Sequence, residues 1–202
     1  RRLASKHFFR PSCAAGARAR RRYRATLPVA RLDIECRPAS YETELEEKKR
    51  IARSHFDDII ALPPTETFES AREEFRMRAE FKVWHDGERS YFAMCDSDRP
   101  KDPVEIADFP MASSRIRELM PTLLREVVAS DVLRRKLFQA NFLTTTTGDA
   151  VVSLLYHRQL DETWEREADA LRRRLGIDII GRARKQKKVL AKDFVVERVA
   201  VD

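Results

Sequence analysis

The sequence predicts an α+β protein: an antiparallel sheet built from successive hairpins, with helices packed on one face of that sheet. Segments in which apolar and polar side chains alternate are joined in pairs by the turn-forming residues Asp86-Gly87 and Gly148-Asp149. Segments with apolar residues at helical spacing lie between these pairs. Because hairpin strands pair in antiparallel fashion, the order hairpin-helix-hairpin-helix-hairpin predicts this fold class.

A first helix is expected from Tyr41 to about Ile60, with Ser40 as its N-cap, and Pro63 and Pro64 follow it. Charged side chains occupy the face expected toward water. The residues expected near the opposite, apolar face are Tyr41, Leu45, Ala52, Phe56 and Ile59.

The most informative segment begins at Phe75 and alternates with period two, which is typical of a strand with one buried face. Tyr91 to Cys95 is the expected return strand, and Asp96 to about Pro110 is expected to be a loop. Phe75, Met77, Ala79, Phe81 and Val83 are expected to point one way, and Arg76, Arg78, Glu80, Lys82 and Trp84 the other.

An unbroken apolar stripe from Ile116 to Val128 predicts the clearest helix, with Ser113 or Ser114 as its cap. A short turn of helix is expected around Asp131 to Leu137.

The second hairpin is expected to join Asn141–Thr147 to Ala150–His157. Asp161 is expected to cap a third helix that Gly176 closes, and Ile177–Ile180 is expected to form the next strand. A basic turn, Arg182–Lys188, should lead to a last strand near Val189 and then to Phe194–Val201.

Charge divides the chain into two parts. The net charge is +7, but residues 1–32 hold ten Lys or Arg and no carboxylate, so the rest has 30 basic and 33 acidic residues. We therefore expect a basic extension over 1–38, disordered or non-native, although a transit peptide or a nucleic-acid-binding tail has the same composition. Residues 39–202 are expected to form one domain, which needs a localised basic patch to bind nucleic acid.

Several kinds of site are not indicated by the sequence. Five scattered glycines form neither a GxGxxG nor a GxxxxGK loop, and the four histidines lack HxxxH and HExxH spacing. The three cysteines lack CxxC spacing, which argues against a zinc site or a disulfide scaffold and for a reducing compartment. No apolar run approaches the ~18 residues of a membrane-spanning helix. We therefore expect no metal, no membrane contact and no complete catalytic site in this chain.

The remaining candidates are cations beside aromatic rings, a combination that suits phosphates and unpaired bases. Each has an ordinary structural alternative: the strand cations as a solvated face, Phe138 as core filler at a helix end, His157 as a satisfied surface residue, and the basic turn as a solvated loop. The proposed RNA-binding residues are Arg76, Arg78, Lys82, Lys136, Phe138, His157, Arg182 and Arg184.

Four segments resemble the N-terminal half of bacterial tRNA (uracil-5-)-methyltransferases, which form ribothymidine in the T-loop of tRNA. They are FRMRAEFKVWHDG (75–87), LRRKLFQANFLTTT (133–146), AVVSLLYHRQLDETWEREADALR (150–172) and IDIIGRARKQK (177–187). The similarity covers about Tyr41 to Asp202, and the arm 1–38 falls outside it.

The resemblance implies that this region grips the T-arm, while a second domain binds S-adenosylmethionine and methylates a flipped uracil through a cysteine adduct. Phe138 and His157 match side chains that insert among T-loop bases, and Arg78 and Lys82 match basic positions facing the RNA. Lys82 stands where some relatives have Arg, which weakens the expectation of a bidentate phosphate contact. The Ser-Cys-Asn-Pro and Cys-Gly-x-Gly motifs of the catalytic domain do not occur in this sequence.

We therefore expect the tRNA-recognition half of a truncated, cytoplasmic bacterial methyltransferase. It would bind the tRNA T-arm and T-arm-like RNA such as tmRNA, and it would bind no cofactor itself. Two alternatives remain open: a stand-alone tRNA-binding module without catalytic activity, and a structural domain without affinity for tRNA.

Overall fold

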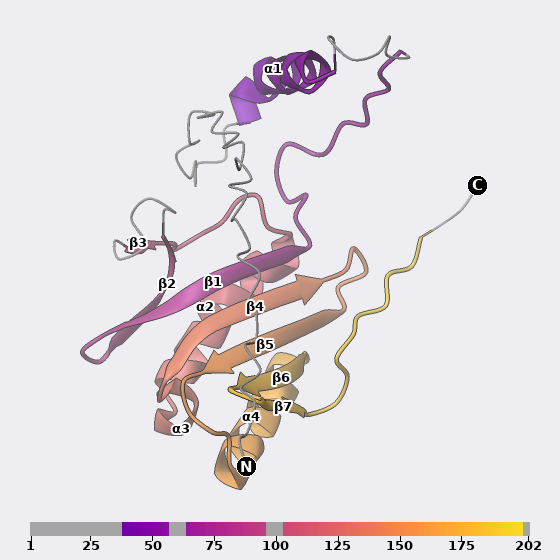
Figure 1. The fold of residues 1–202 in the computed structure, drawn as a ribbon. Helices are drawn as coiled ribbons and strands as arrows, with labels where there is room; N and C mark the ends of the chain where they lie inside the picture. The colour runs from indigo at the N-terminus through magenta and orange to yellow at the C-terminus, as the bar shows by residue number, and fades with distance from the viewer. Residues whose placement is uncertain (1–37, 57–63, 96–102, 200–202) are drawn as a thin grey trace, which may run out of the picture. The chain divides into compact units, whose positions relative to one another are not determined.

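The computed structural model describes residues 38–56, 64–95 and 103–199, all within the unit Leu32–Asp202. Within these residues the chain forms one seven-stranded sheet in the order β3-β2-β1-β4-β5-β6-β7 (Figure 1). The predicted α+β class is confirmed. The predicted extension 1–38 lies almost wholly outside the described residues. The strands are β1 (Arg78–Asp86), β2 (Arg89–Cys95), β3 (Pro103–Glu105), β4 (Leu137–Thr144), β5 (Ala150–Tyr156), β6 (Asp178–Ala183) and β7 (Gln186–Val189).

The first hairpin forms, but β1 begins at Arg78 and not at the predicted Phe75, which is 39% exposed. Ala79, Phe81 and Val83 of β1 are buried, and the residues between them are exposed. Asp86 pairs with Arg89, so the turn is Gly87-Glu88, and Gly87 takes the positive φ of 56° that glycine adopts without strain. The prediction of a loop throughout 96–110 is wrong in one part, because β3 pairs with β2 as an edge strand.

The second hairpin begins earlier than predicted. Strand β4 starts at Leu137, because the short helix α3 (Asp131–Arg134) ends three residues before it. Phe138 therefore lies in a strand and not at a helix end. Leu137 pairs with Tyr156 and Gln139 with Leu155, which leaves Phe138 as the extra residue of a β-bulge.

The prediction of antiparallel pairing fails at one place, since β5 and β6 are parallel. A parallel pair needs a crossover, and helix α4 (Glu162–Leu175) provides it. The caps are those the sequence predicts: the Asp161 side chain accepts from the Trp164 amide, and Gly176 closes the helix with a φ of 61°.

The third hairpin joins β6 to β7 through Arg184 and Lys185, since Ala183 pairs with Gln186. The basic segment 182–188 is thus mostly strand and not a turn. The expected last strand near Val189 is β7, and residues 194–199 after it have no regular structure. Residues 200–202 lie outside the described range.

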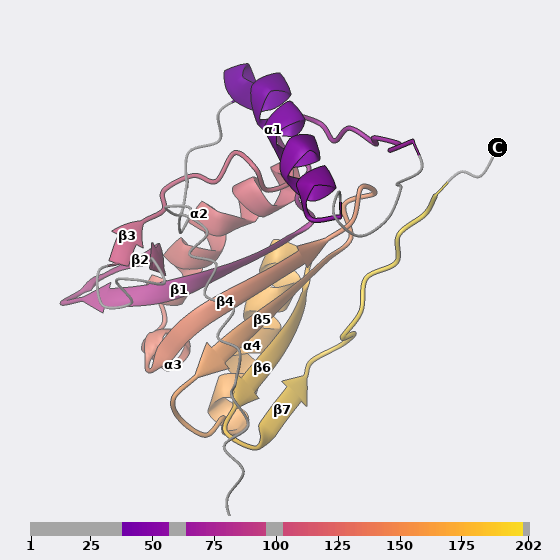
Figure 2. The ribbon, with the colours of Figure 1, turned by 45° about the horizontal axis from the view of Figure 1, so that its top comes forward.

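Helices α2 (Ser114–Val128), α3 and α4 cover one face of the sheet (Figure 2). Ser113 caps α2 by accepting from the Ile116 amide, which decides between the two predicted caps. Buried side chains of both long helices join those of the sheet in a single apolar core, in which Phe81 packs edge-on against Phe109 and Phe142. Among the residues that the structure describes, no helix packs on the opposite face of the sheet.

Helix α1 (Tyr41–Ser54) is shorter than predicted and has no buried residue. Ser40 does not cap it through its side chain, and Ile59 lies outside the described residues. The Tyr41 hydroxyl instead accepts a hydrogen bond from the Ser70 amide at 3.0 Å. The prediction that helices pack on one face of the sheet therefore holds for α2, α3 and α4 but not for α1.

Candidate nucleic-acid interface

The helix-free face of the sheet, called the open face below, presents side chains in rows across the strands. Directly paired residues point to the same side of a sheet, so the register itself shows which residues share this face. Three pairings, Lys82 with Gln139, Gln139 with Leu155 and Leu155 with Arg182, form one such row. The neighbouring rows are Glu80, Asn141, Ser153 and Ile180, and Arg78, Leu143, Val151 and Asp178. The predicted residues Arg78, Lys82 and Arg182 therefore lie on one face, although they are distant in sequence.

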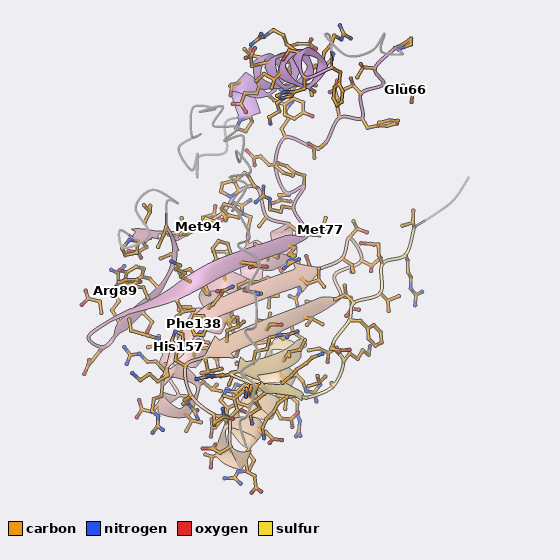
Figure 3. All side chains as sticks on the ribbon, viewed as in Figure 1. Glu66, Met77, Arg89, Met94, Phe138 and His157 are labelled. Carbon is orange, nitrogen blue, oxygen red and sulfur yellow. The ribbon has the colours of Figure 1, made fainter. Side chains whose placement is uncertain are left out.

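Phe138 and His157 form a stacked pair at one end of the open face. Figure 3 labels both residues, which lie close together at the ends of β4 and β5. Their ring centroids are 3.8 Å apart and the planes differ by 10°. The bulge in β4 places Phe138, and the His157 amide donates to the Lys136 carbonyl at 2.9 Å where β5 ends. Lys136 has a φ of 62°, which turns the chain into the strand. Phe138 is half-buried and His157 is exposed, so the pair remains accessible from solvent.

A pocket lies on each side of this pair, and both rings line both pockets. One pocket, of about 590 Å³, has Leu155 and Ala183 on its apolar wall and Arg182 and Arg184 beside them. The other, of about 440 Å³, includes Lys82, Trp84 and Lys136. Apolar walls next to cations suit a flat base with its phosphate.

Other cations near the pair hold the backbone in place. Arg158 donates to the carbonyls of Arg135 at 3.1 Å and Val132 at 2.7 Å, which ties the end of β5 to the segment after α3. Arg134 donates to the Ser90 hydroxyl at 3.0 Å and to the Gly87 carbonyl. Arg134 therefore has a structural role, whereas the side chain of Lys136 has no hydrogen bond or ion pair with any described residue.

The predicted cations differ in whether their side chains already have a partner in the protein. Arg78 pairs with Glu80, and the Lys82 ammonium donates to the Cys95 thiol at 3.2 Å. Arg182, in contrast, is exposed and has no hydrogen bond or ion pair within the described part of the chain.

Arg76 lies outside these rows. It precedes β1, forms an isolated bridge with Ala112, and places its guanidinium 5.9 Å from the Phe109 ring centre. Its side chain therefore packs over a core aromatic ring, away from the Phe138–His157 pair.

The basic segment 182–188 divides between the two faces of the sheet. Arg182 and Lys187 pair on the open face, and Lys187 bonds to Asp193 at 2.6 Å. Lys188 points to the helix side, where it pairs with Glu165 of α4. The prediction of a basic turn over Arg182–Lys188 is therefore wrong in extent, since only Arg184 and Lys185 lie between the paired strands.

Sequence reasoning did not identify Gln139, Asn141, Ser153 and Leu155 as neighbours of the predicted cations. The sequence shows that these residues alternate along β4 and β5. It does not show which strands pair, and the pairing is what brings them beside β1 and β6.

Over residues 38–56, 64–95 and 103–199, no group of three or more His, Cys, Asp or Glu side chains is placed to hold a metal ion. Within the same ranges, no helix has the length and apolarity needed to cross a membrane.

Comparison with known proteins identifies the family. The family model described as tRNA (Uracil-5-)-methyltransferase matches residues 40–202. Three curated relatives are named tRNA/tmRNA (uracil-C(5))-methyltransferase. The one from Chromohalobacter salexigens is 48% identical over 170 residues, which cover 82% of this chain and 45% of the relative. Those from Shewanella amazonensis and Aromatoleum aromaticum are 49% and 43% identical, over 82% and 87% of this chain and 46% of each relative. The chain thus spans slightly less than half the length of these relatives, and it belongs to the tRNA (uracil-5-)-methyltransferase family.

Proposed function

We propose that the open face binds unpaired nucleotides of the tRNA T-loop, and that this chain is the RNA-recognition part of an enzyme that methylates uridine at C5. The observation that carries this proposal is the accessible Phe138–His157 stack between two cation-lined pockets. A loop that unfolds around a flipped uridine exposes bases that need new stacking partners. Both residues of the pair line both pockets.

The energetic contributions follow from the residues at this site. A base stacked on an aromatic ring contributes ~1–3 kcal/mol, with little dependence on the base. Arg182, Arg184 and Lys136 are free to contact phosphates, whose binding releases counterions and therefore weakens with salt. Binding by this face should combine a salt-sensitive part from the cations with a salt-insensitive part from the rings.

S-adenosylmethionine would supply the methyl group in the complete enzyme, but the residues described here do not fit that cofactor. The three glycines with positive φ, Gly87, Gly148 and Gly176, lie in separate turns and form no glycine-rich loop. We therefore assign no residue of this chain to methyl transfer, and we propose that this chemistry belongs to the part of the relatives that the chain does not span. Calorimetric titration of S-adenosylmethionine into this chain should give no binding heat, and a measurable heat would contradict the assignment.

The names of the relatives include tmRNA, and we extend the proposal to T-arm-like RNA of that kind in the bacterial cytoplasm. The alternative is a stand-alone RNA-binding module without catalysis. A co-purified or co-encoded polypeptide with the Ser-Cys-Asn-Pro and Cys-Gly-x-Gly motifs would favour the role as part of a methyltransferase over the stand-alone module.

The test is binding of a T-arm stem-loop RNA to this chain at two salt concentrations. Phe138→Ala should weaken binding by ~1–3 kcal/mol, because it removes the stacking ring, while leaving the salt dependence unchanged, because it removes no cation. Phe75→Ala is the matched control, since Phe75 is also partly exposed (39%) but lines none of the pockets described above. Equal affinities of a folded Phe138→Ala variant and the wild type would refute the role of the stack.

A further inference from the structure

A third pocket, called the Asn141 pocket below, lies on the open face toward the other end of β4. It has a volume of about 430 Å³, which is the size of a small-ligand site. Its apolar lining comes from Leu143, Val151 and Ile180, the last two only 4% exposed. Asn141 and Ser153 are directly paired on β4 and β5 and bring polar groups to the same pocket.

The polar groups of this pocket have unused hydrogen-bonding capacity. The Asn141 carbonyl oxygen accepts from the Gln139 amide at 2.8 Å, but the Asn141 NH₂ group has no partner among the described residues. The Ser153 hydroxyl likewise makes no hydrogen bond within the described ranges. These donors, next to an apolar surface, are the groups that recognise the edge of a flat heterocycle.

Asp193 indicates which part of a nucleotide fits the pocket. Its carboxylate lines the pocket and is held by the Lys187 ammonium at 2.6 Å. That hydrogen bond is the main cause that lowers the pKa of Asp193, and the charge of Arg182 contributes less, so the group is ionised at neutral pH. An ionised carboxylate accepts hydrogen bonds from the N–H groups of a base. Arg78 also lines the pocket, but its guanidinium is already paired with Glu80.

Arg182 connects this pocket to the aromatic stack. It lines both the Asn141 pocket and the 590 Å³ pocket beside Phe138 and His157. A phosphate on Arg182 would therefore lie between a base at the stack and a base in the Asn141 pocket.

We propose that the Asn141 pocket binds a second unpaired base of the same RNA strand, joined through a phosphate on Arg182 to the nucleotide at the Phe138–His157 stack. This inference rests on the proposed RNA-binding function. It adds a site that selects for the base, with Asn141, Ser153 and Asp193 at the edge of the heterocycle.

The experiment fills the pocket without changing charge. Ser153→Phe places a ring over the apolar lining, and Asn141→Leu removes the free NH₂ donor at similar size. Each should weaken binding of a T-arm stem-loop RNA by about tenfold, as expected for loss of one specific base contact. The slope of log affinity against log salt should stay that of the wild type, because no phosphate contact is lost. Val189→Phe is the matched control, since Val189 is paired with Ile180 on the same face but lines none of the described pockets.

The outcomes separate this inference from the proposed function. One outcome would refute only the base-binding role of the Asn141 pocket. In that outcome the wild type binds the RNA and Phe138→Ala weakens binding, but the folded Ser153→Phe and Asn141→Leu variants bind like the wild type. The proposed function would then stand. If the wild type does not bind the RNA, both fail. A decrease of about one in the salt slope of Ser153→Phe would mean a phosphate in the pocket, and it would overturn the assignment to a base. If circular dichroism shows that Ser153→Phe is unfolded, Asn141→Leu decides.

Discussion

Replacing Gly181 by alanine tests how helix α4 packs against the sheet. Gly181 lies in β6 on the helix side, and a Cβ atom there would be 2.3 Å from Cη2 of Trp164 and 2.6 Å from Cδ1 of Leu160. Ordinary carbon contacts begin near ~3.5 Å, so the Trp164 ring would have to move by more than ~1 Å. Trp164 is fully buried and packs edge-on against Tyr156, which leaves it little space to move.

The expected cost follows from this geometry. Overpacking a core by a methyl group costs ~1–3 kcal/mol. Because the ring that must move is fully buried, we expect a cost at the upper end, about 3 kcal/mol. Alanine recovers up to ~1 kcal/mol, because it lowers the conformational entropy of the unfolded chain. We therefore expect Gly181→Ala to lower the free energy of unfolding by about 2 kcal/mol, or Tm by about 4–8 °C for a domain of this size.

The assay is urea unfolding followed by tryptophan fluorescence and circular dichroism. Gly87→Ala is the control, because a Cβ at Gly87 meets nothing within 4 Å and the cost comes only from its positive φ. A double-mutant cycle with Trp164→Leu isolates the clash, since the smaller side chain makes room for the methyl group. If Gly181→Ala is as stable as the wild type, or if its cost is the same in the Trp164→Leu background, the steric reasoning is wrong.

Two further predictions concern a helix cap and pH. Asp161→Ala should destabilise the protein by about 1 kcal/mol, measured by the same unfolding assay, because the Trp164 amide loses its acceptor at 2.8 Å; an unchanged midpoint would exclude a capping contribution. The Glu197 carboxylate accepts from the Thr146 amide at 2.9 Å, and hydrogen bonds from Thr146 lower the pKa of Glu197 from its ordinary 4.5. A lowered carboxyl pKa means that this contact stabilises the segment at pH above 4.5 and is lost as the pH falls through the lowered value. The Thr146 amide resonance should report that loss in an NMR pH titration, and Glu197→Gln should abolish the step; a step that persists in this variant would belong to another group.

Much of the local structure was predictable because its causes lie within a few residues. The alternation from Ala79 to Val83 determines which side of β1 is buried. The N-caps of α2 and α4 each depend on one side chain that accepts a hydrogen bond from the backbone amide three residues later. The stripe in α2 likewise predicts the face that meets the sheet. Helix α1 shows the limit of such reasoning, because its apolar residues have no buried partner despite their spacing.

The site was predictable in its residue types but not in its arrangement. The aromatic residues and cations follow from the sequence, and the resemblance to the family identifies Phe138 and His157 without any geometry. The sequence did not indicate the bulge that aims Phe138 at His157, or the division of the cations at 182–188 between two faces. Both depend on register, and a shift by one residue moves a side chain to the other face of a sheet.

The sequence by itself determined the α+β class, the first two hairpins, the two caps of α4 and the family. The tertiary structure alone decided that β6 lies parallel to β5, and thereby that Arg182 stands in the same row as Gln139 and Lys82. The physical reason is distance along the chain. Periodicity and capping act between near neighbours, whereas the choice of strand partners depends on how Trp164 and the rest of α4 pack against residues far away in sequence.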